Sequence, residues 1–127
     1  GARAISTDVC VPISRLTECI HETKADLADT FLLAPLVGHV GDGNFHLLIL
    51  IDPSNAVEVA EANRLNERLV QRALAMEGTS TGEHGVGIGK AKFMRAEHGA
   101  AVEVMRSVKL ALDPLNLMNP GKILPPA

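Results

Sequence analysis

A glycine-rich turn between two apolar segments constrains the fold of this chain more than any other feature. Residues 36–40 and 45–51 are almost entirely apolar, and the sequence Gly-Asp-Gly-Asn at 41–44 separates them. An Asp-Gly pair between two such segments is the strongest short-range signal of a β-hairpin. If Asp and Gly form a two-residue turn, His39 lies directly opposite His46, and the two imidazoles share one face of the sheet.

The other elements follow from apolar periodicity and from residues that start or end helices. The run at 45–51 has no polar alternation, so we expect a strand buried on both faces. The remaining predicted elements are a strand at 5–13 with Asp8 in its middle, a helix at about 16–31 capped by Ser14, a helix from the capping box of Asn55 and Glu58 to a C′ residue at Gly78, and helices at about 88–97 and 99–112.

This order of elements, β-α-β-β-α followed by a helical tail, predicts an α+β fold. The arrangement is ferredoxin-like: an antiparallel sheet with helices packed on one face. One strand of the usual set is missing, so we expect residues 1–127 to be the C-terminal part of a larger domain, with sequence preceding it in the natural protein.

Composition excludes several classes of partner. Aromatic residues make up 2% of the chain, which leaves no platforms for stacking single-stranded nucleic acid. The formal charge of -3, with no basic block, gives no footprint for a nucleic-acid backbone. No apolar run reaches the ~18 residues of a transmembrane helix, so any membrane association is expected to be peripheral.

The paired histidines predict a site for a divalent metal. Two imidazoles leave a first-row metal short of ligands, and a carboxylate is the usual third. Asp42 suits the turn itself, whereas Glu83 lies in a glycine-rich loop and is the favoured ligand. The alternative is a pair of ordinary half-buried histidines. The pairing also depends on the turn length, because a three- or four-residue loop would separate His39 from His46.

The loop at 82–90 contains four glycines but is not a phosphate-binding loop. His84 stands six positions before Lys90, where that motif requires glycine, and Ala91 replaces its Ser or Thr. A loose anion-binding loop and a flexible connector remain alternatives. In the favoured interpretation Glu83 ligates the metal and His84 is a general base, because imidazole titrates near neutral pH.

Four motifs in order resemble the C-terminal part of FAD-linked D-lactate dehydrogenases, the cytochrome- or quinone-linked flavoproteins of the vanillyl-alcohol-oxidase type. Glycolate oxidase subunits are close relatives of that family. The motifs are TDVCVP at 7–12, GHVGDGNFH at 38–46, GEHG at 82–85, and the segment from LDP at 112–114 to MNPGK at 118–122.

The resemblance implies a cap or substrate domain that works with a separate N-terminal FAD-binding domain, absent from this chain. It places the ligands of a zinc or manganese ion on His39, His46 and Glu83, and the catalytic base on His84. The metal holds a 2-hydroxy acid while a hydride passes to FAD. Asn119, in the Asn-Pro-Gly-Lys turn, is implied to contact the flavin.

Leu48, two positions after His46, bears on the substrate. Relatives that act on D-2-hydroxyglutarate carry a polar residue there, so the resemblance favours D-lactate, oxidised to pyruvate. The alternatives are a glycolate oxidase subunit, a D-2-hydroxyglutarate dehydrogenase, or a non-catalytic metal-binding module. Cytochrome c or a quinone is the implied electron acceptor, and this fragment alone is expected to be inactive. The implied location is mitochondrial in a eukaryote, or cytoplasmic or peripheral to the inner membrane in a bacterium.

Overall fold

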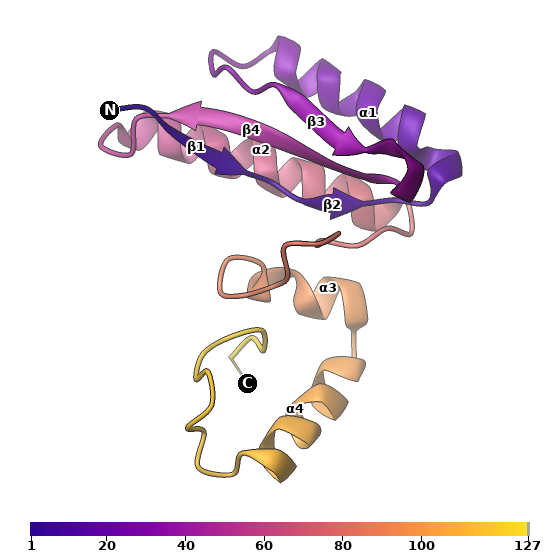
Figure 1. The fold of residues 1–127 in the computed structure, drawn as a ribbon, viewed down its shortest axis with the longest axis vertical. Helices are drawn as coiled ribbons and strands as arrows, with labels where there is room; N and C mark the ends of the chain where they lie inside the picture. Colours follow the sequence, from indigo (N-terminus) through magenta and orange to yellow (C-terminus); the bar gives the residue numbers. More distant parts are fainter. Residues whose placement is uncertain (127) are drawn as a thin grey trace. The chain divides into compact units, whose positions relative to one another are not determined.

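The strand β4 (Asn44–Ile51) is the centre of the first of two structural units, Gly1–His84 and Gly85–Ala127. The computed structural model describes residues 1–126. Along one edge of β4 the chain pairs twice, and every pairing in the sheet is antiparallel (Figure 1). The paired strands are β1 (Arg3–Ser6) and β2 (Val9–Cys10) on that edge and β3 (Leu36–His39) on the other.

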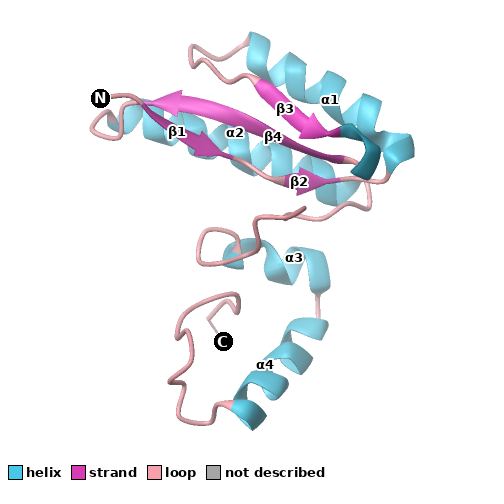
Figure 2. Ribbon diagram, viewed as in Figure 1, coloured by secondary structure: helices cyan, strands magenta, loops and turns pink. Residues whose placement is uncertain are grey.

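The two faces of β4 differ. Phe45, Leu47, Ile49 and Ile51 are buried on the face covered by the helices α1 (Ile13–Ala28) and α2 (Ala56–Ala75) (Figure 2). On the opposite face two residues, Leu48 and Leu50, are only half-buried. The α+β prediction of an antiparallel sheet with helices is therefore confirmed. The prediction that β4 is buried on both faces is wrong at Leu48 and Leu50, whereas His46, on the same face, is buried.

The predicted strand at 5–13 is interrupted at Thr7 and Asp8. The Thr7 hydroxyl accepts a hydrogen bond from the Leu47 amide at 2.8 Å, in place of the Thr7 carbonyl. That carbonyl is thereby free to face the His46 ring, 2.9 Å from Nδ1. The register is the same on both sides of the interruption, because Ser6 pairs with Leu48 and Val9 with Phe45. Asp8 consequently lies opposite His46.

The hairpin loop has four residues, so the predicted two-residue turn is wrong. A 3-10 helix, η1 (Val40–Asp42), is followed by Gly43 at φ 73°. A side chain at Gly43 would also meet the Val11 carbonyl oxygen at 2.1 Å. The register pairs His39 with Asn44 and Val37 with His46. Because the shift is an even number of residues, His39 and His46 become diagonal neighbours and keep the same face.

The helix boundaries show which caps the sequence predicts correctly. The Asn55 side chain accepts from the Val57 and Glu58 amides, so the predicted start of α2 is confirmed. In contrast, α1 begins at Ile13 and Ser14 lies inside it, not at its N-cap. The apolar spacing of residues 56–76 also predicts a buried stripe, which is confirmed at Ala62, Leu65, Leu69, Ala73 and Met76.

The left-handed residue that ends α2 comes one position earlier than predicted. Glu77, with φ 61°, takes the left-handed position that was expected for Gly78. Gly78 donates its amide to the Ala73 carbonyl at 2.8 Å. A Cβ at Gly78 would lie 2.3 Å from the Cys10 carbonyl oxygen, so glycine is needed here for close approach to β2.

The second unit contains η2 (Ala91–Phe93), α3 (Met94–His98) and α4 (Ala101–Leu112). The helix expected at 88–97 is shorter than predicted, and Gly99, at φ 53°, separates it from α4. The apolar spacing of α4 predicts a stripe that includes Val102, Met105 and Val108. Val102 is fully buried, whereas Val108 is exposed. Within residues 1–126, no helix combines the length and apolar character needed to cross a bilayer.

Candidate metal centre

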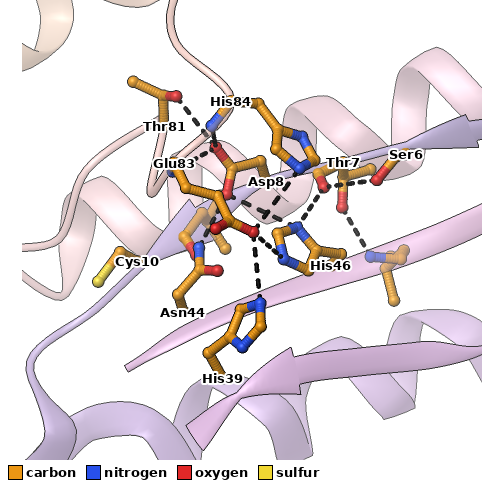
Figure 3. A network of polar contacts seen from close by, with 12 residues as sticks. Ser6, Thr7, Asp8, Cys10, His39, Asn44, His46, Thr81, Glu83 and His84 are labelled. Carbon is orange, nitrogen blue, oxygen red and sulfur yellow. Dashed lines mark hydrogen bonds and ion pairs between the residues drawn. The ribbon is translucent and has the colours of Figure 1, made fainter. Parts of the chain in front are cut away.

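Four residues predicted from the sequence come together on the face of the sheet opposite the helices. His39 ends β3, His46 lies in β4, and Glu83 and His84 belong to the loop at 80–84 (Figure 3). One carboxylate oxygen of Glu83, Oε1, faces the Nε2 atoms of all three histidines. The distances from Oε1 are 3.1 Å to His46, 3.5 Å to His39 and 3.8 Å to His84.

The two ring nitrogens of His46 have different partners. Nδ1 lies 2.9 Å from the Thr7 carbonyl oxygen, which can only accept a hydrogen bond. In the neutral ring the proton is therefore assigned to Nδ1, and Nε2 carries a lone pair. That lone pair faces Glu83 Oε1 at 3.1 Å. Two acceptors at this distance need a proton or a cation between them.

This arrangement fits a divalent metal. A histidine ligand commonly donates its other ring N–H to a carbonyl or carboxylate, as His46 does to Thr7. Imidazole nitrogens with one carboxylate are also the donor set of many zinc and manganese sites. His39, His46 and Glu83 each offer one ligand atom, and these atoms lie within 4.8 Å of one another.

The centre has a buried side and an open side. The His46 side chain is 8% exposed, whereas those of His39 and Glu83 are 60% and 50% exposed. His84 stacks on His46, with ring centroids 4.8 Å apart and the planes 9° from parallel. His39 meets His46 edge-on, with centroids 6.0 Å apart. A small molecule can therefore approach the ligands and His84 from solvent.

Asp8 is a further residue of the site, to which the sequence assigns no role although it lies in the motif at 7–12. It is fully buried, and its Oδ2 accepts hydrogen bonds from Thr81 Oγ1 and from the amides of Glu83 and His84. Its Oδ1 lies 3.6 Å from His46 Nδ1. One signal was present in the sequence, because aspartate is depleted in strands and Asp8 interrupts a run rich in β-branched residues.

Asp8, His46 and His84 form a second set of donors within 4.8 Å of one another. Both oxygens of Asp8 already accept hydrogen bonds, and the residue is closed to solvent. The Nδ1 of His46 faces Thr7. The first set, with Glu83, is therefore the better candidate for an exchangeable metal.

Asn119, the predicted flavin contact, lies in the second unit. It follows α4 in a turn and has φ 45°. Asn119 lines a cavity of about 590 Å³ that contains several basic side chains. These are Lys92, Arg106, Lys109 and Lys122. A role for Asn119 in cofactor binding stays a prediction.

Comparison with known proteins gives a consistent result. The family described as "FAD linked oxidases, C-terminal domain" matches residues 1–123. A "Probable D-lactate dehydrogenase, mitochondrial" from Danio rerio is 58% identical over 98% of the chain and 25% of its own length. A "D-lactate dehydrogenase [cytochrome], mitochondrial" from Arabidopsis thaliana is 50% identical over 99% of the chain and 22% of its own length.

A more distant relative has a different name. "Glycolate oxidase subunit GlcD" from Bacillus subtilis is 32% identical over 94% of the chain and 26% of its own length. The chain thus spans about a quarter of the length of these curated relatives. Because the family match covers nearly every residue, the chain belongs to the family of C-terminal domains of FAD linked oxidases.

Proposed function

We propose that this chain is the substrate-side domain of a flavin-dependent dehydrogenase that oxidises a D-2-hydroxy acid, foremost D-lactate to pyruvate. The convergence of three imidazole nitrogens on one Glu83 oxygen, within 3.8 Å, carries the proposal. Two relatives named as D-lactate dehydrogenases, at 58% and 50% identity, support the substrate.

In this proposal His39, His46 and Glu83 hold a zinc or manganese ion. Such an ion lowers the pKa of a hydroxyl group beside it, so that a weak base can remove the proton at neutral pH. His84 stands at the open side of the same cluster with a 44% exposed side chain. Its Nε2 accepts the proton of the substrate hydroxyl, and its stacking on His46 holds the ring in place for that transfer.

The other half of the reaction requires the flavin. FAD, when bound, accepts the hydride from C2 of the acid, which leaves the 2-oxo acid. We propose that a separate domain of the protein holds most of the FAD and that Asn119 contributes a contact from this chain. The Arabidopsis relative is named for a cytochrome, which favours cytochrome c over a quinone as electron acceptor. The mitochondrial names of both relatives favour that location if the source is a eukaryote.

Leu48 supports a small substrate. It lies two residues beyond His46 in β4, so both side chains leave the same face of the sheet. Leu48 is half-buried and offers no hydrogen bond to a second carboxylate. A short acid such as D-lactate suits this surface better than D-2-hydroxyglutarate. Glycolate is the second candidate, and the Bacillus relative favours it.

A substrate panel on the full-length protein tests the proposal. D-lactate, glycolate and D-2-hydroxyglutarate are compared with an artificial electron acceptor, before and after removal and restoration of zinc or manganese. We expect the highest kcat/KM for D-lactate and loss of activity on metal removal. Full activity without any divalent metal would contradict the proposal, and so would a protein that oxidises none of the three acids.

A further inference from the structure

Asp8 is a buried carboxylate to which the proposed reaction assigns no role. We propose that Asp8 is the positioning residue that holds the loop at 80–84 over His46, so that Glu83 and His84 face the same point as His39. This inference rests on the proposed function for its chemical meaning. All of the contacts that support it lie within the first unit, Gly1–His84.

One oxygen of Asp8 organises the loop. Oδ2 accepts the hydroxyl of Thr81 at 3.0 Å, the amide of Glu83 at 3.0 Å and the amide of His84 at 2.9 Å. Three donors from four consecutive residues thus converge on a single atom. Hydrogen bonds to an ionised acceptor are about twice as strong as neutral ones, so these contacts fix the backbone from which both functional side chains project.

The second oxygen of Asp8 connects this loop to the sheet. Oδ1 accepts the side-chain amide of Asn44 at 2.8 Å and lies 3.6 Å from His46 Nδ1. Asn44 Nδ2 also donates to the Val9 carbonyl at 2.8 Å, which fixes the amide group against β2. Asp8 therefore contacts the strand that carries His46 and the backbone of the loop that carries Glu83.

Gly82 shows how closely the loop is seated. A Cβ at Gly82 would lie 1.9 Å from Asn44 Nδ2 and 2.9 Å from Asp8 Oδ1. At contacts below 3.0 Å either the loop or the two side chains would have to shift, so the Gly82 backbone packs directly on the pair formed by Asp8 and Asn44. Figure 3 shows Asp8 between Glu83 and His84, on the side of the Glu83 carboxylate away from His39.

Removing the Asp8 charge should release the loop without removing any proposed ligand. In Asp8→Asn an NH₂ group replaces one of the two oxygens. If it replaces Oδ2, the three donors of the loop lose their acceptor. If it replaces Oδ1, it faces the NH₂ group of Asn44. We expect faster hydrogen exchange at the Glu83 and His84 amides of the metal-free, full-length protein. We also expect manganese to bind about 10–100-fold more weakly, as when other partners of metal ligands are removed.

Asp42→Asn is the matched control. It removes the same charge from an exposed position that lines the same cavity as His39 and Glu83. We expect both amide exchange at the loop and manganese affinity to stay near those of the unchanged protein. An equal loss of affinity in the two variants would mean that only net charge matters, and would overturn a positioning role for Asp8.

Thr81 gives a second test that does not depend on the folding of Asp8→Asn. Thr81→Val removes one donor to Oδ2 at nearly constant volume, and Thr81→Ser retains it. We expect Thr81→Val to weaken manganese binding about three- to tenfold and Thr81→Ser to restore it. Equal affinity in both, with unchanged exchange at Glu83 and His84, overturns the inference. If the unchanged protein binds neither manganese nor zinc, the proposed function fails, and the exchange measurements alone decide the role of Asp8.

Discussion

Among the side chains of the candidate centre, His46 is the most tightly held. Its ring is buried, Nδ1 faces the Thr7 carbonyl at 2.9 Å, and His84 stacks on one side of the ring. His39 has 60% of its side chain exposed and depends on the hairpin for its position. A ligand that is already ordered loses little conformational entropy on binding, so we expect His46 to contribute most of the affinity and His39 to complete the site.

The assignment of His84 as base predicts a separation between metal binding and turnover. His84→Ala should retain zinc or manganese, because the other three residues keep their ligand atoms. Its kcat for D-lactate should fall by a factor of about 10²–10⁴, the usual contribution of a general base. His21→Ala, at an exposed position of α1, is the control and should behave like the unchanged protein. Unchanged kcat in His84→Ala would exclude this residue as the base.

Gly82 predicts a steric effect on the same site. In Gly82→Ala the added methyl group would overlap Asn44 Nδ2, so either the loop moves away from Asp8 or the Asn44 side chain gives up its hydrogen bonds to Asp8 and Val9. Overpacking of this kind costs about 1–3 kcal/mol, and we expect weaker manganese binding measured by titration. Gly89→Ala is the matched control, because no heavy atom lies within 4 Å of its Cβ position. Equal binding by both variants would mean that the loop position does not matter.

At the level of elements, the sequence predicts helices better than connections. The capping box of Asn55 and the apolar stripe of α2 depend on residues close in sequence, and both are confirmed. The hairpin loop is two residues longer than predicted. Its last residue, Gly43, accepts a hydrogen bond from the Val11 amide at 3.0 Å, a long-range contact that local turn preferences do not contain. The predicted pairing of β3 with β4 is wrong by two residues. Because this shift is even, His39 and His46 still share one face of the sheet.

The interruption at Thr7 and Asp8 shows the same limit. Asp8 hydrogen-bonds a loop more than 70 residues away, and Thr7 replaces a backbone acceptor with its hydroxyl. Neither contact follows from the periodicity of a strand. Asp8 therefore received no predicted role. His39, His46 and Glu83 also have distant partners, but they were predicted because imidazole and carboxylate groups are the usual ligands of a divalent metal.

The end of α4 predicts a pH-dependent structure in the second unit. Lys109 and the amides of Leu117 and Met118 hydrogen-bond the buried Asp113 carboxylate. These contacts, that of Lys109 foremost, lower the pKa of Asp113 from 3.8 to about 2. Because the folded pKa is depressed, the stabilisation is complete above pH 3.8 and is lost as the pH falls toward 2.

Carboxyl and amide NMR titration of the turn checks this prediction. We expect the Asp113 carboxyl to titrate near pH 2 and the Leu117 and Met118 amides to lose protection from exchange over the same range. Asp113→Asn should abolish that transition and leave both amides less protected at neutral pH. Titration of Asp113 at its ordinary pKa of 3.8 would show that the turn is not held by the carboxylate.

In the whole molecule, the two units have different proposed tasks. The first brings the proposed metal ligands and the base to one face of a sheet, and the second carries Asn119 beside a cavity with several basic side chains. The chain spans about a quarter of the length of its D-lactate dehydrogenase relatives. Substrate turnover therefore has to be measured on the full-length protein, with its flavin.

The central claim is that His39, His46 and Glu83 bind a divalent metal. Anomalous diffraction at the zinc and manganese absorption edges, from crystals of the full-length protein, tests it directly. We expect a single peak about 2.0–2.2 Å from Nε2 of His39, Nε2 of His46 and the Glu83 carboxylate. A peak coordinated by Asp8 in place of Glu83, or no peak at this cluster after soaking with either metal, would contradict the claim.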